Sequence, residues 1–90
     1  MRYEVIPSLQ RIFSKLRKKE PVAYQAIWKK IREIVESGNP EHYKPLRYDL
    51  KNKKRVHILS SFVLVFEYDR EQDCLFFLDY GHHDDIYKRH

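Results

Sequence analysis

Apolar residues near the start of the chain form one short alternating run and then a helical stripe. Residues 2–6 alternate roughly between polar and apolar and stop at Pro7, which predicts a short first strand. Ser8 is a favourable N-cap for a helix over residues 8–19. The apolar face of this helix repeats at intervals of three and four residues and consists of Leu9, Ile12, Phe13 and Leu16.

A second set of apolar residues at helical spacing follows almost immediately. It predicts a helix over residues 21–37, with Pro21 in its first turn and Gly38-Asn39-Pro40 as the stop signal. The link between the two helices is only residues 18–20, so we expect an antiparallel pair. Tyr24 and Trp28 widen the second stripe, and we interpret them as packing residues in preference to a base-stacking platform.

The second half of the chain has the pattern of strands joined by short polar turns. Residues 55–59 alternate, residues 62–68 are almost continuously apolar, and residues 75–80 form a third run. The continuous run suits a strand that is covered on both faces. We expect turns at Ser60-Ser61 and at residues 69–73, a strand end at Gly81, and one or two helical turns within residues 84–89. Residues 41–52 are expected to be a connecting segment, anchored by Tyr43, Leu46 and Leu50.

The predicted order is therefore β-α-α-β-β-β plus a short C-terminal helix. Strands in succession with tight turns predict an antiparallel meander, and the helical hairpin must cover one of its faces. The fold class is α+β, with an antiparallel sheet of about four strands. The chain has 90 residues, and residues 1–90 are predicted to be a single domain.

Composition and charge limit the kinds of partner and the cellular compartment that we expect for this protein. The formal net charge is +5, which suits an anionic partner such as nucleic acid, an acidic protein or a membrane face, although a merely soluble protein can carry the same charge. We expect no membrane span and no secretory leader, because no apolar run has the required length. Cys74 is the only cysteine and lies in an apolar run, so we expect a buried thiol in a cytoplasmic protein.

Two groups of residues could carry chemistry. In the C-terminal segment, His83 and Tyr87 lie one helical turn apart if a helix begins near Asp84, and an imidazole with a phenol could act on one substrate. A solvated polar tail explains the same residues equally well. Arg55 and His57 share one face of a predicted strand, preceded by three lysines, and would suit a phosphate and an attacking hydroxyl. By themselves they fit a solvated sheet face better.

A metal site is a weaker interpretation. The chain has five histidines, but their spacing matches no known zinc pattern, and we expect the adjacent His82 and His83 to point apart. No nucleophile motif supports a Ser-His-Asp triad. We therefore predict no metal and no cofactor.

Together these features resemble the RelE/ParE toxin superfamily of toxin–antitoxin systems. The resemblance covers nearly the whole chain, from the first strand and helical hairpin through Lys44-Pro45-Leu46 and the three late strands. It includes a closing segment, His82-His83-Asp84-Asp85-Ile86-Tyr87, which is similar to the family's frequent His-Arg-x-Asp-(Ile/Val)-Tyr. The resemblance implies a RelE-like fold and, for RelE-like members, ribosome-dependent, metal-independent cleavage of mRNA by attack of a ribose 2′-hydroxyl on the adjacent phosphate.

The resemblance also implies roles for individual residues. Arg55 would hold the phosphate, His57 would assist as a second basic group, His83 would be the general base or acid, and Tyr87 would stack on a base or orient the sugar. Further cations are expected to contact RNA phosphates, namely Lys51, Lys53, Lys54, Arg47 and Arg89.

One position departs from the family pattern. Many members carry an arginine that faces the scissile phosphate at the position where this chain has Val63. We therefore expect slow cleavage, and we expect that Val63→Arg would raise the rate. Two alternatives stay open, a ParE-like inhibitor of DNA gyrase and a non-enzymatic binding domain with a decayed active site.

Partners follow from the resemblance as well. It implies a small acidic antitoxin that wraps the toxin, a toxin–antitoxin complex that is a higher oligomer, and ribosomes with mRNA as the target.

Overall fold

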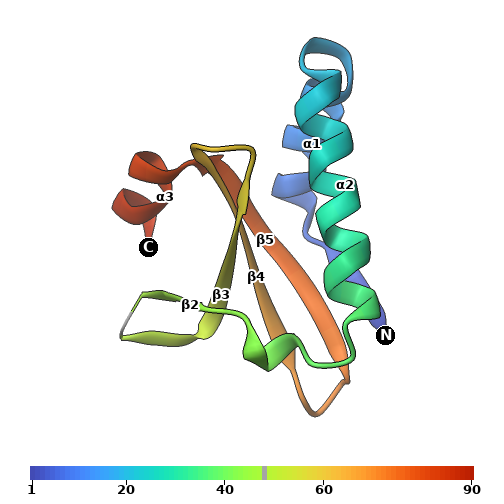
Figure 1. Cartoon of the computed structure of the whole chain (residues 1–90), viewed down its shortest axis with the longest axis vertical. Coiled ribbons are helices and arrows are strands. Elements are labelled where there is room, and N and C mark those ends of the chain that lie inside the picture. Colours follow the sequence, from blue (N-terminus) through green and yellow to red (C-terminus); the bar gives the residue numbers. More distant parts are fainter. Residues whose placement is uncertain (48) are drawn as a thin grey trace.

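The computed structural model describes residues 1–47 and 49–90, with the side chain at position 51 outside the description. Helices and strands follow one another in an order close to the predicted one (Figure 1). In chain order they are β1 (Arg2–Val5), α1 (Pro7–Lys19), α2 (Pro21–Glu36), the 3-10 turn η1 (Pro40–His42), β2 (Pro45–Arg47), β3 (Leu50–Ile58), β4 (Phe62–Asp69), β5 (Cys74–His82) and α3 (His83–Arg89).

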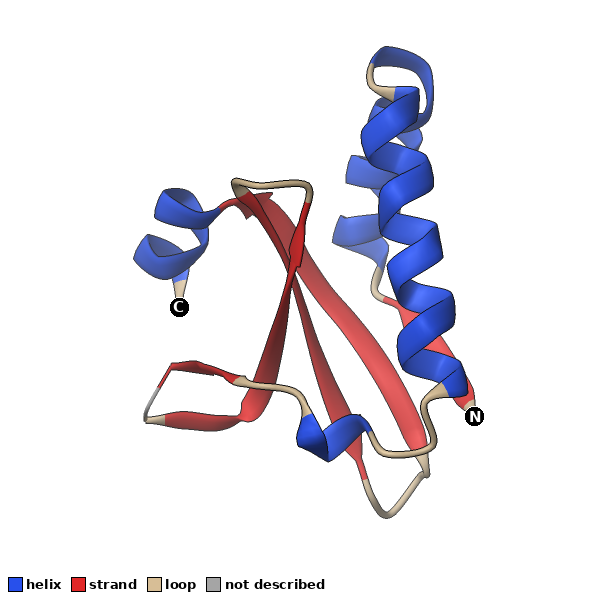
Figure 2. Cartoon of the chain, viewed as in Figure 1, coloured by secondary structure: helices blue, strands red, loops and turns tan. Residues whose placement is uncertain are grey.

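Within the described residues, the five strands belong to one sheet, in the order β1-β5-β4-β3-β2 (Figure 2). The strands β2 to β5 are antiparallel neighbours, as the meander predicted, whereas β1 pairs parallel to β5. No tight turn joins β1 to β5, so nothing forces these two strands to run in opposite directions. The α+β class is confirmed; the parallel edge pair and the strand β2, within the segment expected only to connect, were not predicted.

The helical hairpin packs on one face of the sheet, as expected. Residues on the inner sides of α1 and α2 meet alternate residues of the central strands, and both long apolar stripes are used. This main core consists of Leu9, Phe13, Ile27, Ile31, Ile34, Ile58, Leu64, Phe66, Leu75, Phe77 and Tyr80. The helix α1 begins at Pro7 and not at Ser8, with no side-chain cap, because proline suits the first helical position.

The opposite face of the sheet is covered by α3. Successive residues of a strand point to opposite faces, and in β4 the main core takes Leu64 and Phe66 whereas Val63 and Val65 belong to a second, smaller core. This second core also contains Leu46 from β2 and Ile86 from α3. The continuously apolar β4 is therefore covered on both faces, as its sequence predicted.

Two further features follow from this arrangement. The strand β5 does not end at Gly81 but runs on to His82. A Cβ atom at Gly81 would come within 3.0 Å of Arg89 Nη2 and 3.6 Å of Ile86 Cδ1, so glycine lets α3 approach the strand closely. Among the described residues, Cys74 is the free cysteine, and it is buried.

None of the helices in the described part of the chain is both long enough and apolar enough to span a lipid bilayer.

Candidate functional site

The face that carries α3 contains two neighbouring rows of residues across three strands. Arg55 of β3, Val65 of β4 and Asp79 of β5 form one row, and His57, Val63 and Gly81 form the next. Directly paired residues of antiparallel strands lie on the same face, so Arg55 and His57 share this face as predicted. Arg55 is half-buried and His57 is exposed.

The helix α3 lies over the two valines in the middle of these rows. Ile86 is fully buried and belongs to the same small core as Val63 and Val65. Contacts at both ends hold α3 in place. At its start, the amide of His83 donates to the carbonyl of Ser61, in the turn after β3, at 2.9 Å. Just beyond its end, His90 Nδ1 lies 3.2 Å from Lys53 Nζ of β3.

This arrangement places Arg55 and His57 between the two points at which α3 is held. His83 and Tyr87 both lie within α3, one helical turn apart. Tyr87 is 37% exposed, and the side chain of His83 is 45% exposed. The structure thus brings all four residues to one face of the sheet, with their side chains at least partly open to solvent.

The rings of His82 and His83 do not point apart, contrary to expectation. Their centroids are 4.5 Å apart and the rings are stacked, while His82 Nδ1 accepts a hydrogen bond from the amide of Asp84 at 3.2 Å and caps α3. This cap turns the ring of His82 back toward the first turn of α3, which strand alternation alone does not predict. His82 therefore belongs to the same cluster as His83.

These three residues also raise the question of a metal. Possible ligand atoms of His82, His83 and Asp84 lie within 4.8 Å of one another. The lone pair of an imidazole nitrogen lies in the plane of its ring, and the two rings are stacked with an angle of 29° between them. Their lone pairs therefore run side by side and do not meet at one ion, so this geometry does not fit a chelate unless a ring rotates.

Asp79 is the centre of a polar network that the sequence did not predict. Arg89 donates to both carboxylate oxygens of Asp79 at 3.1 Å, and His90 Nε2 lies 3.0 Å from Oδ2. Burial alone would raise the pKa of Asp79, but the hydrogen bonds from Arg89, His90 and the Tyr80 amide outweigh it and hold the pKa below its ordinary value. The sequence signal that could have revealed this network is Asp79 itself, a lone acid in the apolar run of residues 75–80.

The cations expected to contact RNA are therefore not all available in the same way. Arg89 is paired with Asp79, and Arg47 donates to the carbonyl of His90 at 2.6 Å and lies 3.3 Å from Asp49. Lys53 and Lys54 lie on opposite faces of β3, since Lys53 pairs with Glu67 and Lys54 pairs with the main-core residue Phe66. The expected contact of Lys51 lies outside the described side chains.

Val63 is not placed to carry a phosphate-binding side chain. It is fully buried beneath α3, in contact with the small core. An arginine at this position would have to enter an apolar environment or push α3 away from the sheet. The expectation that Val63→Arg would raise activity does not fit this packing.

Comparisons with known proteins agree with the fold and identify the family to which the chain belongs. Residues 4–87 match the profile of the family described as "ParE toxin of type II toxin-antitoxin system, parDE". A protein of Methanocaldococcus jannaschii that is named as a candidate toxin, RelE4, is 49% identical over 86 residues, which are 96% of this chain and 89% of that protein.

Two further proteins are similar. An uncharacterized protein of Methanosarcina mazei is 45% identical over 75 residues, covering 83% of this chain and 85% of that protein. The solution structure of the conserved hypothetical protein HP0892 from Helicobacter pylori has a TM-score of 0.64 over 96% of this chain and 98% of that chain. Its sequence identity is 20%, so this likeness concerns the fold alone.

Proposed function

Because the chain belongs to the ParE toxin family of type II toxin–antitoxin systems, within the RelE/ParE superfamily, we propose that it is a toxin that cleaves mRNA on the ribosome. The observation that supports this proposal is the placement of α3. The helix carries His83 and Tyr87 over the sheet, and its two ends are held on either side of Arg55 and His57. A cation, two imidazoles and a phenol are then available to one RNA phosphate.

In the proposed reaction, the 2′-hydroxyl of one ribose attacks the adjacent phosphorus. His83 accepts the hydroxyl proton, the new 2′-O–P bond forms, and the bond from phosphorus to the 5′ oxygen of the next nucleotide breaks. Arg55 stabilises the charge on the phosphoryl oxygens, and His57, as a second basic group, protonates the leaving 5′ oxygen. Tyr87 stacks on a base or orients the sugar. The products are a 2′,3′-cyclic phosphate, which hydrolyses to a 3′-phosphate, and a 5′-hydroxyl, and no metal is needed.

The polar network around Asp79 would determine which cations are free to contact an RNA phosphate. Arg47 and Arg89 already have anionic or carbonyl partners, so either must exchange that partner before it contacts a phosphate. Arg55 forms no ion pair among the described residues and would meet the phosphate first. We therefore expect a slow enzyme, because Arg47 and Arg89 must first give up these partners.

A gyrase inhibitor is the second candidate. The observation that favours it is the family match itself, which spans residues 4–87 under the ParE description. In that case α3 and the Asp79 network are structural, and Arg55 and His57 are solvated positions of the sheet.

The test is cleavage of a defined mRNA on purified translating ribosomes, with analysis of the new ends. We expect cuts that leave 2′,3′-cyclic phosphate or 3′-phosphate ends and that persist when EDTA is added to ribosomes kept intact by polyamines. Arg55→Ala and His83→Ala should each lower the rate by about 10²-fold or more, a typical contribution of one catalytic group. His42→Ala is the matched control, because His42 is exposed in η1 and is not part of this face.

The other outcomes separate the alternatives. Loss of cleavage with EDTA would show that a metal takes part. Intact mRNA together with gyrase-dependent DNA breaks would identify the second candidate. Intact mRNA and intact DNA, from a folded chain that still binds its antitoxin, would indicate a binding domain with a decayed site.

A further inference from the structure

Three side chains form a line of hydrogen bonds from β5 to β3, just beyond the end of α3. His90 Nε2 lies 3.0 Å from Asp79 Oδ2, and His90 Nδ1 lies 3.2 Å from Lys53 Nζ. An ammonium group has only donors, so Nδ1 must accept from Lys53, and the ring proton lies on Nε2, which donates to Asp79. The imidazole in this line is therefore neutral, and Asp79 fixes its orientation.

The centre of this line is largely protected from solvent. The side chain of Asp79 is 16% exposed and that of His90 is 15% exposed, while Lys53 is half-buried. The carboxylate of Asp79 is fixed further by Arg89, which donates to both of its oxygens. The ring of His90 therefore has little freedom to turn away from Lys53.

The residue that faces Lys53 across the sheet is an acid. Lys53 is directly opposite Glu67 of β4, and the Cβ atoms of such a pair are about 4.5–5.5 Å apart on the same face of the sheet. Opposite charges in these positions normally attract each other. Lys53 nevertheless forms no ion pair with any residue that the structure describes. Because its partner is a neutral ring, the charge of the ammonium stays available to another anion.

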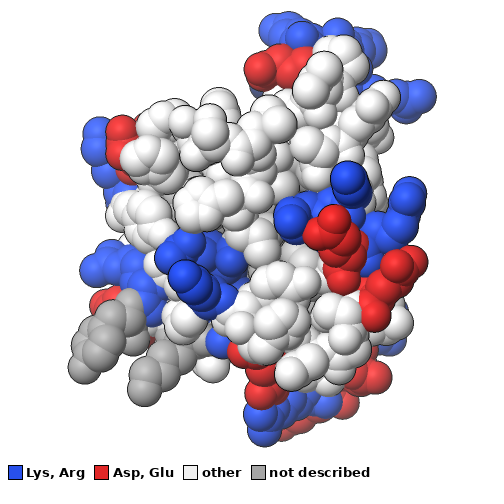
Figure 3. All heavy atoms as spheres, viewed as in Figure 1, with Lys and Arg blue, Asp and Glu red and all other residues white. Residues whose placement is uncertain are grey.

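This available charge lies on the proposed catalytic face. Lys53 and Arg55 are two residues apart on β3, so they project from the same face at positions about 6–7 Å apart. Figure 3 shows lysines and arginines gathered where the end of α3 lies beside β2 and β3. Arg55 holds the scissile phosphate in the proposed reaction, and the long side chain of Lys53 can reach the same phosphate.

We propose that His90 and Asp79 are positioning residues, which hold the ammonium of Lys53 ready for the RNA phosphate and away from Glu67. Lys53 then shares with Arg55 the stabilisation of the negative charge that develops on the phosphoryl oxygens. A neutral imidazole orients an ammonium without cancelling its charge, whereas the carboxylate of Glu67 would cancel it. This inference rests on the proposed function, because it assigns further residues to the same reaction.

The first test replaces His90 in the ribosome cleavage assay. His90→Ala removes the ring but keeps the backbone carbonyl that accepts from Arg47, and it leaves Arg89 paired with Asp79. Lys53 should then turn to Glu67. We expect kcat to fall about tenfold and KM to stay within about twofold, because the contact with the phosphate strengthens as charge develops in the transition state. His90→Gln should keep most of the activity, since an amide also offers one acceptor and a donor.

The second test removes the competing acid. In His90→Ala/Glu67→Gln, no carboxylate is opposite Lys53, so kcat should recover to within about threefold of the wild type. Glu67→Gln with His90 intact should change kcat by less than about twofold, so the recovery measures the coupling between the two residues. The matched double variant His90→Ala/Glu71→Gln removes an acid from the exposed turn after β4 and should stay as slow as His90→Ala. If His90 merely anchored α3, the two double variants would be equally slow.

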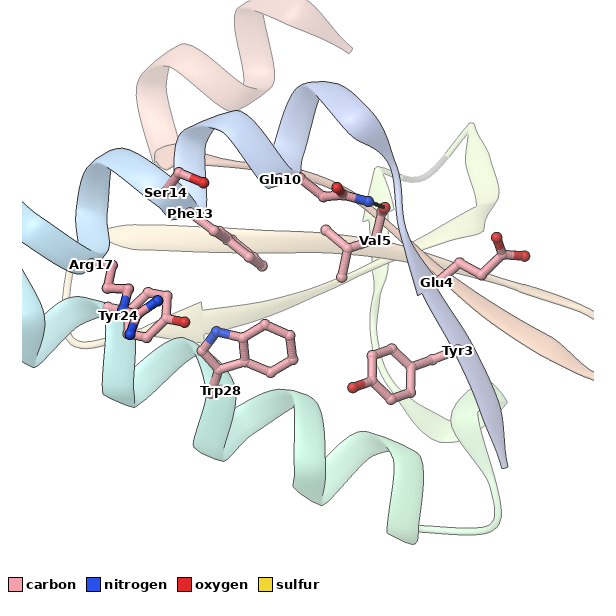
Figure 4. Close-up of a pocket in the computed structure, with 9 residues that line it drawn as sticks. All are labelled: Tyr3, Glu4, Val5, Gln10, Phe13, Ser14, Arg17, Tyr24 and Trp28. Carbon is pink, nitrogen blue, oxygen red and sulfur yellow. Dashed lines mark hydrogen bonds between the residues drawn. The ribbon is translucent and has the colours of Figure 1, made fainter.

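The third test removes the ammonium itself. Lys53→Met should lower kcat by about tenfold or more, since a group that stabilises the transition-state charge is lost. The matched control is Arg17→Met. Arg17 lines a surface pocket of about 460 Å³ between β1, α1 and α2, on the side of the sheet that the helical hairpin covers (Figure 4). Loss of this distant, screened charge should change kcat by less than about twofold.

A measurement without ribosomes separates this inference from the proposed function. In an imidazole ¹⁵N spectrum of the full chain, Lys53→Met should move the His90 Nδ1 signal, which loses its donor, while Arg17→Met should leave it in place. An Nδ1 signal that Lys53→Met does not move would overturn the inference. So would a chain that cleaves mRNA but in which Glu67→Gln fails to rescue His90→Ala. If the wild-type chain cuts no mRNA but the Nδ1 signal moves as expected, the proposed function fails and the positioning of Lys53 by His90 is supported.

Discussion

Replacing Asp79 by Asn should loosen α3, because one carboxylate holds the end of that helix. The side chain of Asp79 is 16% exposed and accepts two hydrogen bonds from Arg89 and one from His90. A hydrogen bond to a charged group is worth about 1.5–3 kcal/mol when it is buried, whereas an exposed ion pair is worth about 0.2–1 kcal/mol.

The Asp79 network lies between these limits. The side chain of Arg89 is 49% exposed, so water can replace part of what it loses, but that of His90 is only 15% exposed. We therefore expect Asp79→Asn to lower the free energy of unfolding by about 1–2 kcal/mol at neutral pH. The assay is urea unfolding followed by circular dichroism, together with amide exchange of residues 83–89.

The pH dependence gives a second readout for the same variant. The pKa of Asp79 in the folded chain lies below its ordinary value of 3.8, so this carboxylate stabilises the fold at every pH above 3.8. The stabilisation is lost as the pH falls from 3.8 through the lower folded pKa. The difference between the wild-type chain and Asp79→Asn should therefore be full at neutral pH and vanish in acid.

A matched variant removes the same charge elsewhere. Glu71 is exposed in the turn after β4, and Glu71→Gln should change the free energy of unfolding by less than about 0.5 kcal/mol. The reasoning would be refuted if Asp79→Asn were as stable as the wild type at neutral pH. It would be refuted equally if the difference between them persisted unchanged below the folded pKa.

Further variants test the turn after β3 and the packing around α3. Leu59 has a φ of 57° and is 60% exposed, so Leu59→Gly should relieve backbone strain and raise the urea midpoint by the equivalent of about 0.5–1 kcal/mol; a lower midpoint would contradict this. Ile86→Ala removes the buried anchor of α3 and should cost about 2–4 kcal/mol, seen as faster amide exchange in that helix, and unchanged exchange would show that the anchor lies elsewhere. Val63→Arg should destabilise the chain by about 3 kcal/mol or more in urea and lower activity, while Val63→Ala costs less; a stable, faster Val63→Arg enzyme would restore the original expectation.

Local patterns were enough to predict most of the fold. The apolar stripes of α1 and α2 have helical spacing, and β4 is continuously apolar because both of its faces are covered. The strand β2 was missed because three residues that begin with Pro45 carry no strand pattern. Its extended conformation depends on pairing with β3. The parallel direction of β1 was missed because it depends on a contact with β5 at the other end of the chain.

The candidate site was predictable only where the chain is locally regular. The shared face of Arg55 and His57 follows from strand alternation, and the spacing of His83 and Tyr87 follows from the helix. The network of Asp79 with Arg89 and His90 depends on how α3 folds back on the sheet, and no local pattern reports that. The continuously apolar run of β4 did predict that Val63 is covered, but not that α3 is the element that covers it.

The most direct test of the central claim is to express the chain from an inducible promoter and map the 5′ ends of cellular mRNA. The account predicts new 5′-hydroxyl ends within translated reading frames soon after induction. These ends should be strongly reduced for Arg55→Ala and His83→Ala and retained for His42→Ala. Unchanged mRNA ends in cells that stop growing, with DNA breaks that depend on gyrase, would contradict it.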